Sequence, residues 1–365
     1  MKISVVTVCF NSVNTIEQTI QSIVCQGYSD LEYIIIDGGS SDGTLDIIKK
    51  YRRYITSWIS EPDCGIYDAM NKGLKKCTGE IIAFLNSDDW YEKDTLKKVE
   101  HYFMSTMADI VSGNVYLYSD GQVRKMELDR EDEENVFFKV IYPHPALFVR
   151  HDFFNKMGGY DTSYKIAADT AWIINAYTAG ATILSVEDCF TYFRIGGLSC
   201  QRSYEGLKEC YKAAYMCAQS NGMELTVRRV EEYYSTLLKD AVREQKLVDA
   251  LNNNIAEVKK LFDYNRRYYI WGAGERGRAC QKLFTTLEIP IAGFIDRNPD
   301  KKDVEGYPVV PAGEIAQQSF ICITPKGYER EIMEQLILSG MDQADLLVYA
   351  DLLEQIAELG KYEEI

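Results

Sequence analysis

The chain has 365 residues and is 46% hydrophobic, which is enough for two packed domains or for one large domain and a smaller module. Its formal net charge of −15 argues against nucleic-acid binding, because no broad positive surface is expected. Ten cysteines form neither a C-x-x-C pair nor a metal-type cluster with histidine, a pattern typical of a reduced, cytoplasmic protein. The first residues, KISVVTV, resemble a strand rather than a signal peptide, and no apolar run approaches the ~20 residues that span a bilayer. Any membrane contact is expected to be peripheral, at the inner face.

Residues 1–200 alternate short β-branched runs with helical patterns. Strands are expected at 3–8, 33–37, 81–85, 109–115 and 181–186. Between the first two, Asn14 and Glu17 are spaced as a helix-capping pair before apolar residues that recur on one helical face. Continuous apolar strands separated by helices predict an α/β domain with a mostly parallel central sheet covered on both faces.

The strand at 81–85 ends in the polar residues Asn86, Ser87, Asp88 and Asp89. In open parallel sheets, ligands bind at the carboxyl ends of the strands. Two adjacent carboxylates there are unfavourable unless water or a cation neutralises them, and hard divalent ions prefer oxygen ligands. The pair therefore indicates a cation site. The alternative is a loop whose aspartates cap the next helix, although Asp94 already occupies that position.

A second strand end, IIIDGGSSDGT, leaves its strand at Asp37 and turns through Gly38 and Gly39. A carboxylate followed by glycines suits a nucleoside, because the acid accepts hydrogen bonds from ribose or base and the glycines permit close approach. The same pattern is also common in an ordinary turn that caps a helix.

Four segments occur in one order: VVTVCFNSVNTIEQTIQSI, IIIDGGSSDGT, EPDCGIYDAMNKGLKKCTGEIIAFLNSDDWY and GGYDTSYKIAADTAWI. Together they closely resemble the inverting family 2 glycosyltransferases with the A-type fold, over residues 1–200, and especially enzymes of bacterial surface-polysaccharide assembly. The resemblance implies transfer of a hexose or N-acetylhexosamine from a nucleotide-diphosphate sugar, with a UDP-sugar expected. The implied acceptor is a glycan or a lipid-linked glycan.

The family's D-x-D element falls on residues 86–88, so the resemblance implies that Asp88 binds the metal, Mn²⁺ or Mg²⁺, with Asp89 as its neighbour. Asn86 replaces the usual first aspartate, so the metal would have one carboxylate ligand fewer than in most family members. The amide of Asn86 is expected to contact the donor. Many members carry an arginine near the diphosphate where this chain has Met70, and Lys72 is the candidate substitute. A lysine in this position is also often simply solvated.

Further nucleotide-sugar contacts implied by the resemblance are Phe10, Asn11, Asp37, Asp63 and Asp68. The catalytic base of the family falls on Asp169 in KIAADTAWIINAY, where Ala168 replaces a preceding acid. The alternative for Asp169 is an ordinary helix-start aspartate. His144 is a candidate on the acceptor side or a packed histidine. Arg194 lies with two glycines in the stretch 192–199, which suits either a loop closing over the diphosphate or a plain connector.

Residues 201–265 are expected to form a helical connector packed on the first domain, and 266–365 a small Rossmann-like module. In this module Gly272, Gly274 and Gly277 form G-x-G-x-x-G after a strand, and Asp296 ends the next strand, so all four are nucleotide candidates. The module has only about half the length of a two-lobed dinucleotide domain. We therefore expect a mononucleotide-type or purely structural module.

Two other functions are compatible with the sequence. One is an NAD-linked or nucleotide-sensing binding protein that acts through residues 266–365, and the other is an inactive glycosyltransferase-like subunit. Asp88 and Asp169 distinguish the glycosyltransferase from the NAD-linked alternative, because transfer needs both residues and the NAD-linked alternative needs neither. A homo-oligomer is compatible with every alternative.

Overall fold

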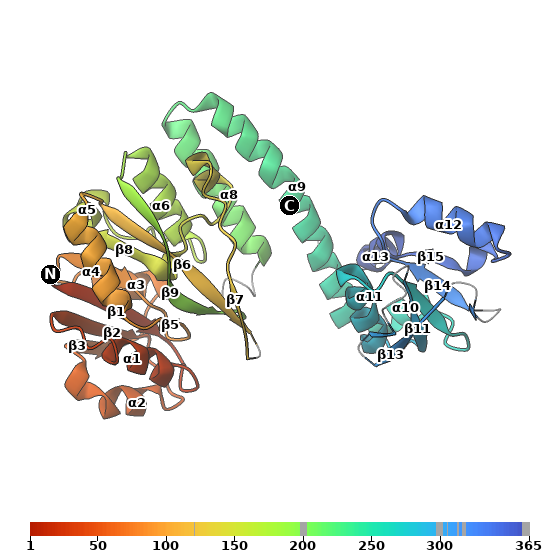
Figure 1. Ribbon diagram of the computed structural model, residues 1–365, viewed down its shortest axis with the longest axis horizontal. Helices are drawn as coiled ribbons and strands as arrows, with labels where there is room; N and C mark the ends of the chain where they lie inside the picture. The colour runs from red at the N-terminus through yellow and green to blue at the C-terminus, as the bar shows by residue number, and fades with distance from the viewer. Residues whose placement is uncertain are drawn as a thin grey trace. The chain divides into compact units, whose positions relative to one another are not determined.

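The computed structural model describes residues 1–119, 121–197, 203–296, 302–304, 306–311, 314–315 and 319–359 (Figure 1). The chain divides into two compact units, Met1–Leu238 and Lys239–Ile365. The division lies inside helix α9 (Glu224–Asn253), within the stretch that the sequence predicts as a connector. The flanking helices are α8 (Ser203–Ser220) and α10 (Ile255–Lys259). None of the described helices is both long and apolar enough to cross a bilayer.

Unit 1 contains a sheet with the strand order β3-β2-β1-β4-β8-β6-β9-β5, and β7 pairs with β6. The strands are β1 (Ile3–Cys9), β2 (Leu31–Asp37), β3 (Ser57–Ser60), β4 (Ile81–Phe84), β5 (Trp90–Tyr91), β6 (Ile110–Ser119), β7 (Gln122–Lys125), β8 (Leu147–Arg150) and β9 (Ile183–Arg194). Strands β3, β2, β1 and β4 are parallel, and their register aligns Cys9, Asp37 and Ser60 at one edge. This edge carries the carboxyl ends where the sequence predicts ligand binding.

The second half of the sheet is mixed. Strand β8 is antiparallel to both β4 and β6, and the short strands β5 and β7 are antiparallel to β9 and β6. Sequence reasoning predicts a mostly parallel sheet because it finds the long apolar runs, whereas β5, β7 and β8 have only two to four residues each. The predicted α/β fold with a central sheet is confirmed. The apolar pattern of the sequence did not reveal the short antiparallel strands β5, β7 and β8.

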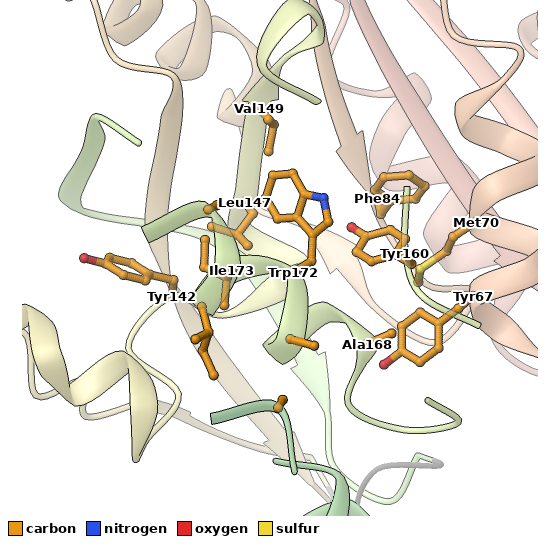
Figure 2. Packing of buried hydrophobic residues seen from close by; sticks show 14 of the residues in the cluster. Tyr67, Met70, Phe84, Tyr142, Leu147, Val149, Tyr160, Ala168, Trp172 and Ile173 are labelled. Atoms are coloured by element: carbon orange, nitrogen blue, oxygen red, sulfur yellow. The ribbon is translucent and has the colours of Figure 1, made fainter. Parts of the chain in front are cut away.

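Helices cover both faces of this sheet. They are α1 (Ile16–Val24), α2 (Thr44–Lys50), α3 (Ile66–Leu74), α4 (Thr95–Ser105), α5 (His151–Met157) and α6 (Ala168–Thr178), with short 3₁₀ turns η1 (Arg52–Tyr54), η2 (Glu133–Phe137) and η3 (His144–Ala146). Alternate residues of β1 enter two separate cores: Val5 packs with Ile20 of α1, and Val6 with Met70 of α3. Burying each such side chain contributes about 1.5–3 kcal/mol. Figure 2 shows the second of these cores around Trp172.

Two predicted helix caps do not form. Helix α1 begins after Thr15 without a side-chain cap, and Glu17 instead pairs with Lys50 at 2.6 Å. Asp94 does precede α4, but its backbone is left-handed (φ 59°) and its side chain makes no capping hydrogen bond. Asp94 instead lies 3.5 Å from Lys97. Both acids therefore form ion pairs with nearby lysines and do not accept hydrogen bonds from the amides at the helix start.

Unit 2 is a smaller α/β domain, as the sequence predicts. Its strands are β10 (Tyr268–Trp271), β11 (Ile291–Ile295), β12 (Asp303–Val304), β13 (Tyr307–Val310), β14 (Phe320–Ile323) and β15 (Leu346–Val348). Its helices are α11 (Glu275–Thr286), α12 (Glu329–Leu338) and α13 (Tyr349–Glu358), with the turn η5 (Gln343–Asp345). The order β13-β11-β10-β14-β15 is that of a doubly wound parallel sheet, and among the strands that the structure describes in this unit only β12 pairs antiparallel.

Candidate active site

A cleft of about 700 Å³ opens at the carboxyl ends of β1 and β4 in unit 1. Much of its lining comes from four segments: residues 8–12 at the end of β1, residues 86–88 beyond β4, Gly65, Ile66, Tyr67, Ala69 and Met70 at the start of α3, and Lys165, Ile166 and Asp169 before and within α6. The serine hydroxyls of Ser12 and Ser87 lie 2.8 Å apart and join the first two segments. The cleft therefore brings together residues as far apart in the sequence as Val8 and Gly197.

The segment beyond β4 presents one side-chain oxygen that lacks a partner, beside a carboxylate. The Asn86 side-chain oxygen is buried without a hydrogen bond, and the neighbouring Asp88 lines the cleft. Burial raises the pKa of the Asp88 carboxyl. Asp89 is almost fully buried outside the cleft lining, where its Oδ1 accepts a hydrogen bond from the Arg194 backbone N–H at 3.0 Å. Burial, and then the charge of Asp88, raise the pKa of Asp89.

Arg194 lies behind this segment rather than in the cleft lining. Its guanidinium packs over the rings of Trp90 and Tyr118, donates from Nε to the Asp88 carbonyl at 3.2 Å, and donates to Gln18 at 2.8 Å. The side chain therefore supports the backbone that carries Asp88. Of the predicted loop 192–199, Gly197 lines the cleft, whereas residues 198 and 199 lie outside the described part of the chain.

Asp37 is fully buried beneath the cleft and is absent from its lining. Its carboxylate accepts hydrogen bonds from the Gly39 N–H at 3.1 Å, the Ser40 N–H at 3.0 Å and the Ser60 hydroxyl at 2.6 Å. Burial opposes ionisation, but the hydrogen bonds from Ser40 and Ser60 outweigh it and lower the pKa of Asp37. The residue thus anchors the loop that follows β2.

Phe10 and Asn11 lie at the cleft, as the resemblance implies. Phe10 is 63% exposed, which is unusual for a large aromatic side chain that follows a buried strand. Asn11 adopts a left-handed backbone (φ 48°), and its side-chain oxygen accepts from the Ser41 N–H at 3.0 Å. Asp63 also lines the cleft, with a carboxylate oxygen 2.5 Å from the position that a Cβ on Gly38 would take. A side chain at position 38 would therefore force the Asp63 carboxylate to move.

Asp68 and Lys72 lie on α3 outside the cleft lining. The Lys72 ammonium pairs with Glu61 at 3.1 Å and with Asp68 at 3.5 Å, and it donates to the Pro62 carbonyl at 3.1 Å. In this structure Lys72 forms ion pairs with neighbouring acids and does not line the cleft.

Asp169 lies in the first turn of α6 and lines the cleft. Its Oδ1 is 2.9 Å from the hydroxyl of Tyr67, a residue that sequence reasoning did not single out although it lies in the GIYDAMNKG motif. His144 lines the same side, where its Nε2 is 3.0 Å from the Tyr160 hydroxyl and its ring stacks on Phe84. Burial lowers the pKa of His144, which favours the neutral imidazole.

The charges along the cleft are predominantly negative. Among the lining residues that the structure describes, Asp63, Asp88 and Asp169 contribute three carboxylates, and Lys165 contributes one cation that sequence reasoning also missed. Within the described part of the chain, no three His, Cys, Asp or Glu residues form a cluster able to hold a metal alone. A diphosphate entering this cleft would therefore need additional positive charge, or a cation that shares its ligands between the protein and the phosphates.

In unit 2, the glycine turn after β10 is explained by packing. Gly272 has φ 98°, and its N–H donates to the Ile295 carbonyl at 2.7 Å. A Cβ on Gly277 would lie 1.8 Å from the Gly272 carbonyl oxygen, whereas one on Gly274 would meet nothing within 4 Å. Asp296 accepts a hydrogen bond from the Ala273 N–H at 2.9 Å. The motif thus holds β10, α11 and β11 together, and nucleotide binding by these residues remains a prediction.

Residues 4–165 match the family described as Glycosyl transferase family 2. An uncharacterized glycosyltransferase of Mycobacterium tuberculosis is 32% identical over 185 residues, which cover 48% of this chain and 68% of the relative. A PGL/p-HBAD biosynthesis glycosyltransferase of Mycobacterium bovis is 31% identical over 205 residues, which cover 54% of this chain and 78% of the relative. The family resemblance found in the sequence is confirmed.

Two solved structures have a similar fold. TarS 1-349 of S. aureus in complex with UDP-GlcNAc is 22% identical with a TM-score of 0.51, covering 60% of this chain and 66% of that chain. The mannosyltransferase PcManGT of Pyrobaculum calidifontis, in complex with GDP-Man and Mn²⁺, is 15% identical with a TM-score of 0.52, covering 79% of this chain and 85% of that chain. At these identities the likeness supports the A-type fold alone.

Proposed function

This chain belongs to glycosyl transferase family 2, and from that premise we propose that it is an inverting hexosyl- or N-acetylhexosaminyltransferase of surface-polysaccharide synthesis. The proposed donor is a nucleotide-diphosphate sugar, and the proposed acceptor is a hydroxyl of a glycan or lipid-linked glycan. The observation that carries the proposal is that Asp88 and Asp169, which the family motifs single out independently, line the same cleft. A UDP-sugar is the first donor to test, because a structure of the same fold contains UDP-GlcNAc.

Asp169 is the proposed general base. Its carboxylate takes the proton of the acceptor hydroxyl as that oxygen forms a bond to the anomeric carbon. The bond between the anomeric carbon and the phosphate oxygen breaks on the opposite side, and its electron pair leaves with the nucleoside diphosphate. A single displacement of this kind inverts the anomeric configuration. His144, neutral and on the same side of the cleft, is proposed to contact the acceptor.

Asp88, with the unpartnered oxygen of Asn86 beside it, fits a divalent cation. Mg²⁺ and similar ions are commonly bound by one or two carboxylates together with substrate phosphates, so a cluster of three protein ligands is not required. Mn²⁺ or Mg²⁺ bound here would offset the negative charge of the departing diphosphate. The three carboxylates against one lysine in the cleft also favour this assignment.

For the nucleoside, we propose that the exposed ring of Phe10 stacks on the base and that Asp63 accepts hydrogen bonds from the base or ribose. Asp37 is proposed to act indirectly, by fixing the loop that brings Gly38 against Asp63. Asn11 stabilises the same loop through its bond to the Ser41 N–H.

The proposal is tested by a thermal-shift and calorimetric screen of UDP-, GDP- and dTDP-sugars, with and without Mn²⁺ or Mg²⁺, and of NAD(H). Wild type and Asp88→Ala are compared. We expect one nucleotide-sugar class to stabilise the wild type in a metal-dependent way that Asp88→Ala removes. Stabilisation by NAD(H) alone, unchanged in Asp88→Ala, would transfer the function to residues 266–365. Donor binding without any turnover would indicate an inactive subunit.

A further inference from the structure

The proposed base is held by a buried phenol. Tyr67 comes from α3, is 6% exposed, and its hydroxyl lies 2.9 Å from the Asp169 Oδ1. The same hydroxyl is also hydrogen-bonded to the Ile166 backbone carbonyl, two residues before α6. In Figure 2 the ring of Tyr67 reaches toward Ala168 at the start of that helix. One side chain of α3 thus contacts both the base and the loop that leads to it.

A tyrosine hydroxyl has one proton, whereas two acceptors lie within reach here. When Asp169 is ionised it has no proton to give, so the Tyr67 proton is directed to the carboxylate or shared with Ile166. After Asp169 has taken a proton, its own O–H can donate to the Tyr67 oxygen, and Tyr67 then donates to the Ile166 carbonyl. The arrangement therefore gives Asp169 a hydrogen-bond partner both before and after proton transfer.

The other groups around Asp169 do not compete for this role. Burial raises the pKa of Tyr67, and the Asp169 charge adds to the effect, so the phenol stays protonated as a donor. Burial raises the pKa of the Cys210 thiol on α8 to about 11 and lowers that of His144, so both are neutral near pH 7. Tyr160 is hydrogen-bonded to His144. The exposed Lys165 donates to the Thr162 carbonyl at 3.2 Å.

The loop before the base is also held from α8. The Glu209 carboxylate accepts three consecutive backbone N–H groups, those of Lys165 at 2.8 Å, Ile166 at 2.7 Å and Ala167 at 2.9 Å. Helix α6 has no side-chain cap of its own at Ala167. Glu209 therefore fixes the backbone of the loop, which leaves the Tyr67 hydroxyl to orient the Asp169 carboxylate itself.

We propose that Tyr67 is a positioning residue for Asp169: its hydroxyl orients the carboxylate toward the cleft and exchanges donor and acceptor roles with it as the acceptor proton arrives. The proposal rests on the proposed function, in which Asp169 is the base. It extends that function to a residue on α3 that never needs to touch the substrate.

The test compares wild type, Tyr67→Phe and Tyr234→Phe in steady-state turnover of the nucleotide sugar that binds. Tyr234 is a matched control, because it is also buried and donates to a backbone carbonyl, that of Phe137 at 3.2 Å, but lies outside the cleft lining. We expect Tyr67→Phe to lower kcat about 10- to 100-fold with donor KM changed less than about 3-fold. The acid limb of its pH profile should move to higher pH, because the ionised carboxylate loses a donor. Unchanged kcat and an unchanged profile would overturn the proposal.

A second readout does not depend on turnover. The ¹³C carboxyl resonance of Asp169, assigned by its loss in Asp169→Asn, is titrated in wild type and in both tyrosine variants. A titration midpoint that moves to higher pH in Tyr67→Phe and stays fixed in Tyr234→Phe supports the hydrogen bond. Equal midpoints in all three proteins overturn it. If the wild type turns over no nucleotide sugar, the proposed function fails, and this titration still decides whether Tyr67 orients Asp169.

Discussion

The two ends of the sheet in unit 1 hold acidic side chains in opposite ways. At the amino end of β2, Glu32 accepts hydrogen bonds from Lys2 at 2.8 Å, from the Thr78 N–H at 2.7 Å and from Ser4. Burial opposes ionisation of Glu32, but these hydrogen bonds outweigh it and lower its pKa to about 2. Beyond the carboxyl end of β4, burial raises the pKa of Asp88, because a backbone hydrogen bond and the charge of Arg194 offset it only in part. A carboxylate whose oxygens are already hydrogen-bonded within the protein stabilises the fold, whereas one with few such partners is available to a ligand.

The same distinction separates the two units. The strand-end acid of unit 2, Asp296, accepts from the Ala273 N–H, and a Cβ on Gly277 would collide with the Gly272 carbonyl oxygen. In unit 1, Asn86 and Asp88 leave oxygen atoms at the cleft. The motif in unit 2 therefore has a structural explanation, whereas in unit 1 the proposed cation would account for the unpartnered Asn86 oxygen beside Asp88.

The largest expected effect is that of Asp169→Asn. Loss of the base should lower kcat at least about 10³-fold while donor affinity stays within about 3-fold, because the amide keeps the shape but accepts no proton. Asp161→Asn, at an exposed acid outside the cleft lining, is the control and should leave both constants unchanged. Normal turnover by Asp169→Asn would contradict the mechanism.

Glu32→Gln tests whether the hydrogen-bonded carboxylate at the amino end of β2 stabilises the fold. The folded pKa of about 2 lies below the ordinary value of 4.5, so ionised Glu32 contributes stability above pH 4.5 that is lost as the pH falls toward 2. We expect the variant to lose roughly 3 kcal/mol of unfolding free energy at pH 7, measured by urea denaturation, with the difference shrinking between pH 4.5 and 2. Donor affinity should be unchanged. A difference independent of pH would show that another interaction is responsible.

Asp88→Asn should have the opposite profile. We expect kcat/KM to fall about 100-fold and the metal-dependent part of donor affinity to disappear, whereas the unfolding free energy at pH 7 stays equal or rises. Stability does not fall because the variant removes a charge that burial disfavours. Calorimetry with the donor and urea denaturation measure the two effects. If Asp88→Asn lost as much unfolding free energy as Glu32→Gln, Asp88 would stabilise the fold in the same way as Glu32, and the proposed difference between the two ends of the sheet would be wrong.

The smallest expected effect is that of Gly277→Ala in unit 2. The added methyl would lie against the Gly272 carbonyl, so unfolding of unit 2 should be easier by about 1–3 kcal/mol. Gly274→Ala is the matched control, with open space for the methyl, and should change stability by less than about 1 kcal/mol. Hydrogen exchange of β10 amides distinguishes the variants. Equal protection in both would mean that the turn is not closely packed.

The sequence predicts the A-type fold, the smaller second α/β unit and the segments that form the cleft, because apolar strands and short motifs are local signals. It could not predict which acids are already satisfied. Asp37 looks like a ligand-binding residue in its motif, but Ser60, 23 positions later, occupies one of its oxygens. Lys72 is a candidate diphosphate contact in the sequence, but in the structure it forms an ion pair with Glu61. The Tyr67–Asp169 contact joins residues 102 positions apart, so no local pattern could reveal it.

The most direct test of the central claim is the stereochemistry of donor cleavage. The nucleotide sugar that binds is incubated with wild type or Asp169→Asn, with water as the acceptor, and proton NMR records the first anomer released before mutarotation. We predict that the wild type releases the sugar with inverted configuration and that Asp169→Asn releases it at least about 10³-fold more slowly. Release with retained configuration, or at the wild-type rate by Asp169→Asn, would contradict a single displacement in this cleft.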